Sequence, residues 1–91
     1  MKTVCIRAII SGKVQGVFYR HATKQTAESL TITGWVKNNS DDTVELIACG
    51  DEKNIQQFIT WLWQGPPKAR VAHVEWSSIP EEKHDAFFIQ R

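Results

Sequence analysis

The sequence predicts an α+β fold in which one antiparallel sheet carries two helices on one face. Short runs rich in β-branched residues alternate in the manner of strands. Two longer segments instead place apolar residues at the i, i+3, i+4 spacing of a helix. Turn-forming residues separate these segments, and the order along the chain is β-α-β-β-α-β with a short final strand. Two helices cannot cover both faces of a small sheet, so we expect both helices on the same face.

The first half of the chain contains three predicted strands and one helix. Val4 to Ile10 alternate with a period of two and are predicted as the first strand. Tyr19 to Leu30 carry a helical apolar stripe, although threonines lower the helix propensity of this segment. Ile32 to Asn38 and Thr43 to Cys49 are predicted as a hairpin, because Asn39 to Asp42 between them are typical turn residues.

The second half contains the strongest helix pattern. Asp51 suits an N-cap position, and the sequence Gly65-Pro66-Pro67 ends the helix. Val71 to Ile79 and Ala86 to Arg91 are the last two predicted strands. The stripe on the helix consists of Ile55, Phe58, Ile59 and Leu62.

This order of elements is that of the ferredoxin-like split β-α-β sandwich. Right-handed crossovers place the first and third predicted strands side by side in the centre of the sheet. A chain of 91 residues is too short for a second core, so we expect a single domain over residues 1–91.

Composition argues against several classes of partner. The net charge is +1 and the pI is about 7.8, so the chain has no strong basic field to attract nucleic acid or an anionic membrane. No apolar stretch approaches the ~20 residues of a membrane span. Arg7 interrupts the N-terminal apolar run, which is unlike a signal peptide. We therefore expect a cytoplasmic monomer without nucleic-acid or membrane partners.

The run from Gly12 to Arg20, Gly-Lys-Val-Gln-Gly-Val-Phe-Tyr-Arg, connects the first strand to the first helix. A glycine-containing loop that opens a helix can direct several backbone N–H groups at one anion. Arg20 adds a planar fork of donors that matches phosphate oxygens. The run therefore predicts a pocket for a phosphoryl group.

Two spaced motifs resemble those of the acylphosphatases. The run from Gly12 to Arg20 matches the first signature of that family at every position. Gly34-Trp35-Val36-Lys37-Asn38 resembles the start of the second signature, which continues at Val44 and Gly50. Asp42 departs from the pattern, because the family usually has glycine at this turn, and Asp accepts a positive φ angle with modest strain.

The resemblance implies a role for each part of the site. Arg20 and the loop amides would hold the phosphoryl oxygens, and Asn38 would hold the attacking water. Hydrolysis of the acyl phosphate would be direct, with no cofactor and no metal ion, and inorganic phosphate or sulfate should bind in the same place. The residues alone agree, because amides and one guanidinium stabilise a phosphoryl group but cannot protonate a poor leaving group. The amides belong to Gln15, Gly16, Val17, Phe18 and Tyr19.

Two other functions compete with hydrolysis. One is a non-catalytic anion-binding module with the same loop. The other is an RNA- or protein-interaction domain on the same scaffold, which the near-neutral charge and the lack of aromatic residues on the first and third strands disfavour.

Cys5 and Cys49 raise a separate question. Cys5 opens the first predicted strand and Cys49 closes the third, so the two residues should lie opposite each other if these strands pair in antiparallel fashion. A cross-strand disulfide is then possible. Two buried thiols are the alternative that a reducing cytoplasm favours.

Overall fold

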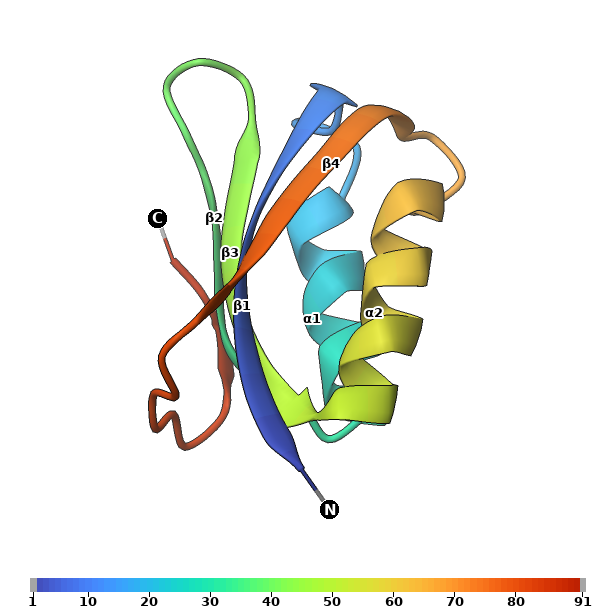
Figure 1. Cartoon of the computed structure of the whole chain (residues 1–91). Helices are drawn as coiled ribbons and strands as arrows, with labels where there is room; N and C mark the ends of the chain where they lie inside the picture. Colours follow the sequence, from blue (N-terminus) through green and yellow to red (C-terminus); the bar gives the residue numbers. More distant parts are fainter. Residues whose placement is uncertain (1, 91) are drawn as a thin grey trace.

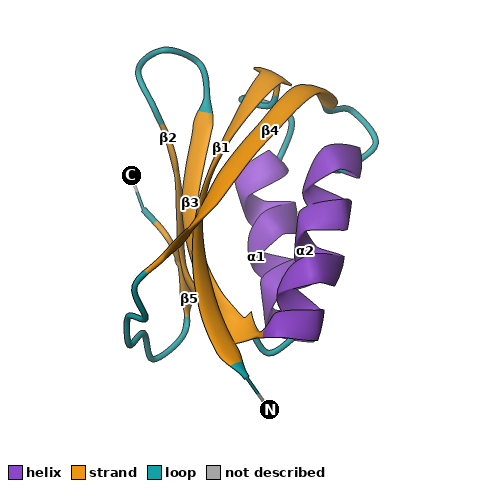
Figure 2. Cartoon of the chain, viewed as in Figure 1, coloured by secondary structure: helices purple, strands orange, loops and turns teal. Residues whose placement is uncertain are grey.

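The computed structural model describes residues 2–90 and contains a five-stranded sheet with two helices packed against one face (Figures 1 and 2). The strands lie in the order β4-β1-β3-β2-β5. The predicted α+β fold and the central position of the first and third strands are therefore confirmed. The elements are β1 (Thr3–Lys13), α1 (Tyr19–Ser29), β2 (Thr33–Asn38), β3 (Val44–Asp51), α2 (Glu52–Gln64), β4 (Arg70–Ile79) and β5 (Phe87–Ile89).

The last strand differs from the prediction of a purely antiparallel sheet. β5 pairs with β2 in parallel, whereas the other three strand pairs are antiparallel. β4 ends at the end of the sheet where β2 begins, so a strand that runs back along β2 is parallel to it. The strand is also shorter than Ala86 to Arg91, and Arg91 lies outside the described residues.

β1 extends three residues beyond Ile10 because β4 pairs with it as far as Lys13. The register between these two strands shifts between Ser11 and Gly12. Gly12 has a φ angle of 120°, and a Cβ atom there would collide with the backbone of β4 at Arg70 and Ala72. The first glycine of the motif thus allows the paired strands β1 and β4 to approach closely at this point.

The core lies between the helices and one face of the sheet. Alternate residues of the central strands point into it, as Ile6, Ala8 and Ile10 do from β1, each at most 2% exposed. Phe58 and Leu62 of α2 meet them with no exposed surface. The predicted stripe of this helix is therefore its buried face, with Ile59 partly buried at the edge.

Two local features help to place the strands and the second helix. A Cβ atom at Gly34 would collide with the carbonyl group of Ile47, so glycine at this position allows β2 to lie close to β3. Asp51 is the N-cap residue of α2, but its side chain makes no capping hydrogen bond. Neither helix in the described part of the chain is long and apolar enough to cross a membrane.

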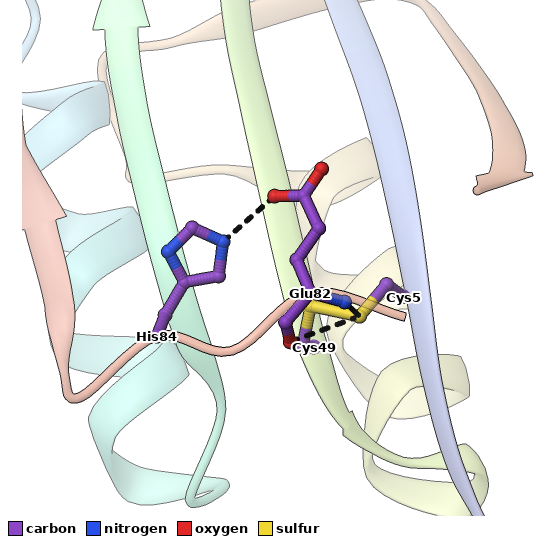
Figure 3. Close-up of polar contacts among 4 residues, drawn as sticks. All are labelled: Cys5, Cys49, Glu82 and His84. Atoms are coloured by element: carbon purple, nitrogen blue, oxygen red, sulfur yellow. Dashed lines mark hydrogen bonds and ion pairs between the residues drawn. A yellow bond between two sulfur atoms is a disulfide. The ribbon is translucent and has the colours of Figure 1, made fainter. Parts of the chain in front are cut away.

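Cys5 and Cys49 are directly opposed in the β1–β3 register and form a disulfide (Figure 3). The bond lies on the face of the sheet that the helices leave open, under the segment that joins β4 to β5. The backbone N–H of Glu82 donates to the Cys5 sulfur at 3.3 Å, and the Glu82 carboxylate lies 2.9 Å from the His84 ring nitrogen Nε2. Only 2% of Cys5 and 4% of Cys49 are exposed, so the connecting segment shields the bond from solvent.

Reduction of the disulfide should lower the free energy of unfolding by up to about 4 kcal/mol, because the bond closes a loop of 44 residues in the unfolded chain. Urea denaturation with and without a phosphine reductant measures this difference. The double variant Cys5→Ser, Cys49→Ser is the control and should not respond to the reductant. Identical unfolding midpoints for the oxidised and reduced wild-type protein would contradict the prediction.

Candidate active site

The loop between β1 and α1 has an unusual backbone conformation. Gly16 and Phe18 both lie in the left-handed region, with φ angles of 74° and 63°. Glycine adopts this conformation freely, whereas a bulky residue such as Phe18 does so at an energetic cost. Phe18 is the N-cap residue of α1, so the chain reaches the first helical turn through this strained position.

The loop leaves its donors unpaired. Within residues 2–90, the backbone N–H groups of residues 15–20 donate to no main-chain or side-chain acceptor. The positive end of the α1 dipole lies at the same place. Unpaired amides at a helix N-terminus are suited to an anion, and the predicted phosphoryl pocket stays a prediction that this geometry supports.

Arg20 follows Tyr19 in the first turn of α1 and lines the same hollow as the loop. Its side chain has no ion-pair partner in the part of the chain that the structure describes. Because this partly buried residue has no carboxylate partner within residues 2–90, no described side chain competes with an anionic ligand for its guanidinium.

Asn38 approaches from the other side. It is the last residue of β2, and its side chain lines the hollow together with Arg20. The Asn38 oxygen Oδ1 is buried and has no hydrogen-bond partner among the described residues. Such an acceptor costs free energy unless a bound molecule supplies a donor. The hollow measures about 280 Å³ and is lined by Val14, Gly16, Phe18, Tyr19, Arg20, His21, Asn38 and Ile89.

The Gln15 side chain joins the loop to the hairpin, a role that our sequence analysis missed because it assigned only the backbone amide of this residue. Its Nε2 group donates to the carbonyl oxygens of Asn39 and Thr43, both at 2.9 Å. These two residues flank the β2–β3 turn, directly after Asn38 and directly before β3. A long amide side chain within the Gly12–Arg20 motif was the signal that could have indicated this contact.

A buried tyrosine holds the start of α1. The Tyr19 hydroxyl donates to the Leu62 carbonyl oxygen of α2 at 2.7 Å, and burial raises the pKa of this phenol. A side chain at Gly65 would lie only 2.9 Å from the Tyr19 ring. The two helices are therefore tied together at the end where the phosphoryl group is expected.

The turn after Asn38 accepts Asp42 in the place where the family has glycine. Asp42 has a φ angle of 73°, the positive value that we expected there. Neighbouring residues stabilise the turn, because the hydroxyl and backbone N–H of Thr43 donate to Asp41 Oδ1 at 2.6 and 3.1 Å. These bonds, that of the hydroxyl first, lower the pKa of the Asp41 carboxyl.

Arg20 and Asn38 thus line one hollow with the loop residues Gly16, Phe18 and Tyr19. Gln15 and Val17 are not among the lining residues, and Val17 packs in the core. Cys5 and Cys49 pair near the other end of the sheet. Within residues 2–90, no three His, Cys, Asp or Glu side chains are grouped as a metal site would require.

Comparison with known proteins identifies the family. The family model named Acylphosphatase matches residues 6–89. A curated acylphosphatase from Coxiella burnetii (strain Dugway) is 49% identical over 86 residues, which cover 94% of this chain and 90% of the relative. The chain belongs to the acylphosphatase family.

Solved structures agree with this membership. The crystal structure of the Bacillus subtilis acylphosphatase is 32% identical and superposes with a TM-score of 0.94, covering 97% of this chain and 99% of that chain. A full-length HypF in a phosphate- and nucleotide-bound form is 25% identical with a TM-score of 0.92, and the match covers 99% of this chain but 12% of that chain. The acylphosphatase fold therefore occurs both alone and within a longer protein.

Replacing Gln15 with alanine should loosen the loop, because both hydrogen bonds to the hairpin are lost. We expect the free energy of unfolding to fall by about 1–2 kcal/mol and the affinity for inorganic phosphate to fall with it. Chemical denaturation and calorimetric titration measure the two effects. Gln25→Ala, an exposed site on α1, is the matched control and should change neither quantity. Wild-type phosphate affinity in Gln15→Ala would show that the loop holds its shape without the hairpin.

Proposed function

We propose that this chain hydrolyses acyl phosphates to a carboxylate and inorganic phosphate without a metal ion. In this proposal Arg20 and the amides of Gln15 to Tyr19 hold the phosphoryl group, and Asn38 holds the attacking water. Membership of the acylphosphatase family makes the chain a hydrolase of acyl phosphates. The roles of the individual residues are our inference from the geometry.

One observation carries this assignment. Among residues 2–90 the buried Asn38 oxygen accepts no hydrogen bond, and Asn38 lines the same hollow as Arg20. A water molecule has the O–H groups that Asn38 Oδ1 requires. Such a water would bind next to a phosphoryl group held by Arg20, with a lone pair free to face the phosphorus atom.

The loop supplies donors for the phosphoryl oxygens. Backbone amides need no reorganisation when charge develops on these oxygens, because the loop fixes their direction before the substrate binds. Phosphoryl transfer passes through a loose transition state in most analyses, so that positioning and charge stabilisation account for most of the catalysis.

The reaction then balances without further reactants. The water oxygen bonds to phosphorus as the bond between phosphorus and the bridging oxygen breaks. The bridging oxygen leaves with its electron pair on the carboxyl group, which accepts the proton of the water and later releases it to solvent. A carboxylate is a good leaving group, so the site needs no general acid to assist its departure.

Location and assembly belong to the same proposal. We propose that the protein acts as a monomer in the cytoplasm, since near-neutral charge and the lack of a long apolar segment give it no evident membrane or nucleic-acid partner. The competing function is anion binding without turnover. The similarity to a small part of HypF supports this competitor, because it shows that the fold also occurs within a longer protein.

An assay of benzoyl phosphate hydrolysis in excess EDTA separates the two functions. We expect the wild-type protein to remain active, because no step requires a metal ion. Arg20→Ala and Asn38→Ala should each lose about a hundredfold or more in kcat/KM, since each removes a group that stabilises the transition state. Lys24→Ala, a neighbouring cation on α1, is the control for a general loss of charge. Phosphate binding without turnover in the wild-type protein would favour the anion-binding module.

Arg20→Lys tests the shape of the donor rather than its charge. Lysine keeps the positive charge but loses the planar pair of N–H groups. We expect inhibition by inorganic phosphate to weaken by about tenfold or more, with a comparable loss of activity. Near-normal inhibition and turnover in Arg20→Lys would show that a point charge is sufficient.

A further inference from the structure

We infer that the acyl group of the substrate binds against an apolar rim formed by Phe18 and Ile89, so that the site prefers aromatic and other large apolar acyl groups to acetyl. This inference rests on the proposed function, because it places the phosphoryl group between Arg20 and the loop amides. The rim residues line the hollow and come from distant parts of the chain.

The Phe18 side chain is not part of the hydrophobic core. The residue is 76% exposed. Within residues 2–90, the other exposed large hydrophobic residues are all less exposed than Phe18. The residue also has a φ angle of 63°, a conformation that is costly for a bulky side chain. Phe18 lines the hollow, so its exposed ring offers apolar surface that a bound acyl group could cover.

Ile89 reaches the hollow through the parallel pairing that the sequence analysis did not predict. It is the partner of Val36 in the β2–β5 register, two residues before Asn38. The backbone N–H of Gln90 donates to the Val36 carbonyl oxygen at 2.8 Å and fixes the end of β5 at this position. Ile89 is 37% exposed, so its side chain has surface left for a ligand to cover.

The hollow can hold more than a phosphoryl group. Its volume of about 280 Å³ is close to the lower limit of about 300 Å³ for small-molecule pockets. In this proposal the phosphoryl group lies against Arg20 and the acyl group extends from the bridging oxygen toward the remaining lining, which includes both rim residues. An apolar acyl group at this place would bury both its own apolar surface and that of Phe18 and Ile89, which favours binding.

The binding of two non-hydrolysable analogues tests the inference separately from turnover. Phenacylphosphonate and acetonylphosphonate share the phosphorus group and differ only in phenyl against methyl. Calorimetric titration of the wild-type protein should give an affinity for the phenacyl compound higher by about tenfold or more. Phe18→Asn and Ile89→Thr should each reduce this ratio by about threefold or more.

The variants are chosen to preserve the backbone. Asn tolerates the left-handed conformation of position 18, and Thr keeps the β-branched shape at position 89. Phe88→Thr is the matched control, since Phe88 is adjacent in β5 and 52% exposed but does not line the hollow. It should leave the ratio unchanged.

The outcomes distinguish the two hypotheses. A wild-type ratio near one, or a ratio that neither Phe18→Asn nor Ile89→Thr alters, overturns the apolar rim. A clear preference for phenacylphosphonate without turnover of benzoyl phosphate overturns the proposed function and leaves the rim standing. Absence of binding by both analogues overturns both.

Discussion

The two hydrogen bonds of the Gln15 side chain are the contact on which the site depends most. β3 lies between β1 and β2, so the chain segments that continue these two strands are about 10 Å apart at the level of the sheet. The backbone alone does not bring a loop after β1 close to the last residue of β2. The Gln15 side chain spans this distance, because it reaches from the loop to the carbonyl groups of Asn39 and Thr43 in the turn that joins β2 and β3. The proposed sites for the anion and for the water are neighbours for this reason.

The loop is held in a costly shape by contacts on both sides of it. Gly16 and Phe18 have left-handed backbones, a conformation found in loops whose successive amides bind an anion. Behind them, the Tyr19 hydroxyl is fixed to α2 and the Thr23 hydroxyl donates to the Tyr19 carbonyl oxygen at 2.7 Å. Strain at a functional loop persists only where the surroundings determine the conformation, and here a helix and a hairpin do so together.

Sequence periodicity predicted the elements well because burial on one face sets the period. The stripe of α2 and the alternation of β1 follow directly from the core that they share. The contacts that the sequence did not predict are those between elements distant in the chain. The parallel pairing of β5 depends on where β4 ends, and the register shift at Gly12 depends on the pairing of β1 with β4. No local pattern encodes either relation.

The candidate site shows the same difference between features that a local pattern predicts and contacts between distant elements. Arg20 and the loop amides could be assigned because strand, loop and helix follow one another in the sequence. Asn38 was assigned through the family resemblance alone, and Ile89 was not assigned at all, because its place beside the hollow follows from the β2–β5 register. Side chains brought together by strand pairing are visible only once the sheet order is known.

The disulfide and the candidate site lie at opposite ends of the sheet. The disulfide joins β1 and β3 at Cys5 and Cys49, whereas the loop begins after Lys13, about 25 Å along the same strand. Reduction of the disulfide acts mainly on the unfolded chain, because the cross-link lowers the conformational entropy of that state. The loop at the other end is held by its own contacts to α2 and to the hairpin. The disulfide can therefore change the stability of the fold without changing the geometry of the site, although a single strand connects them.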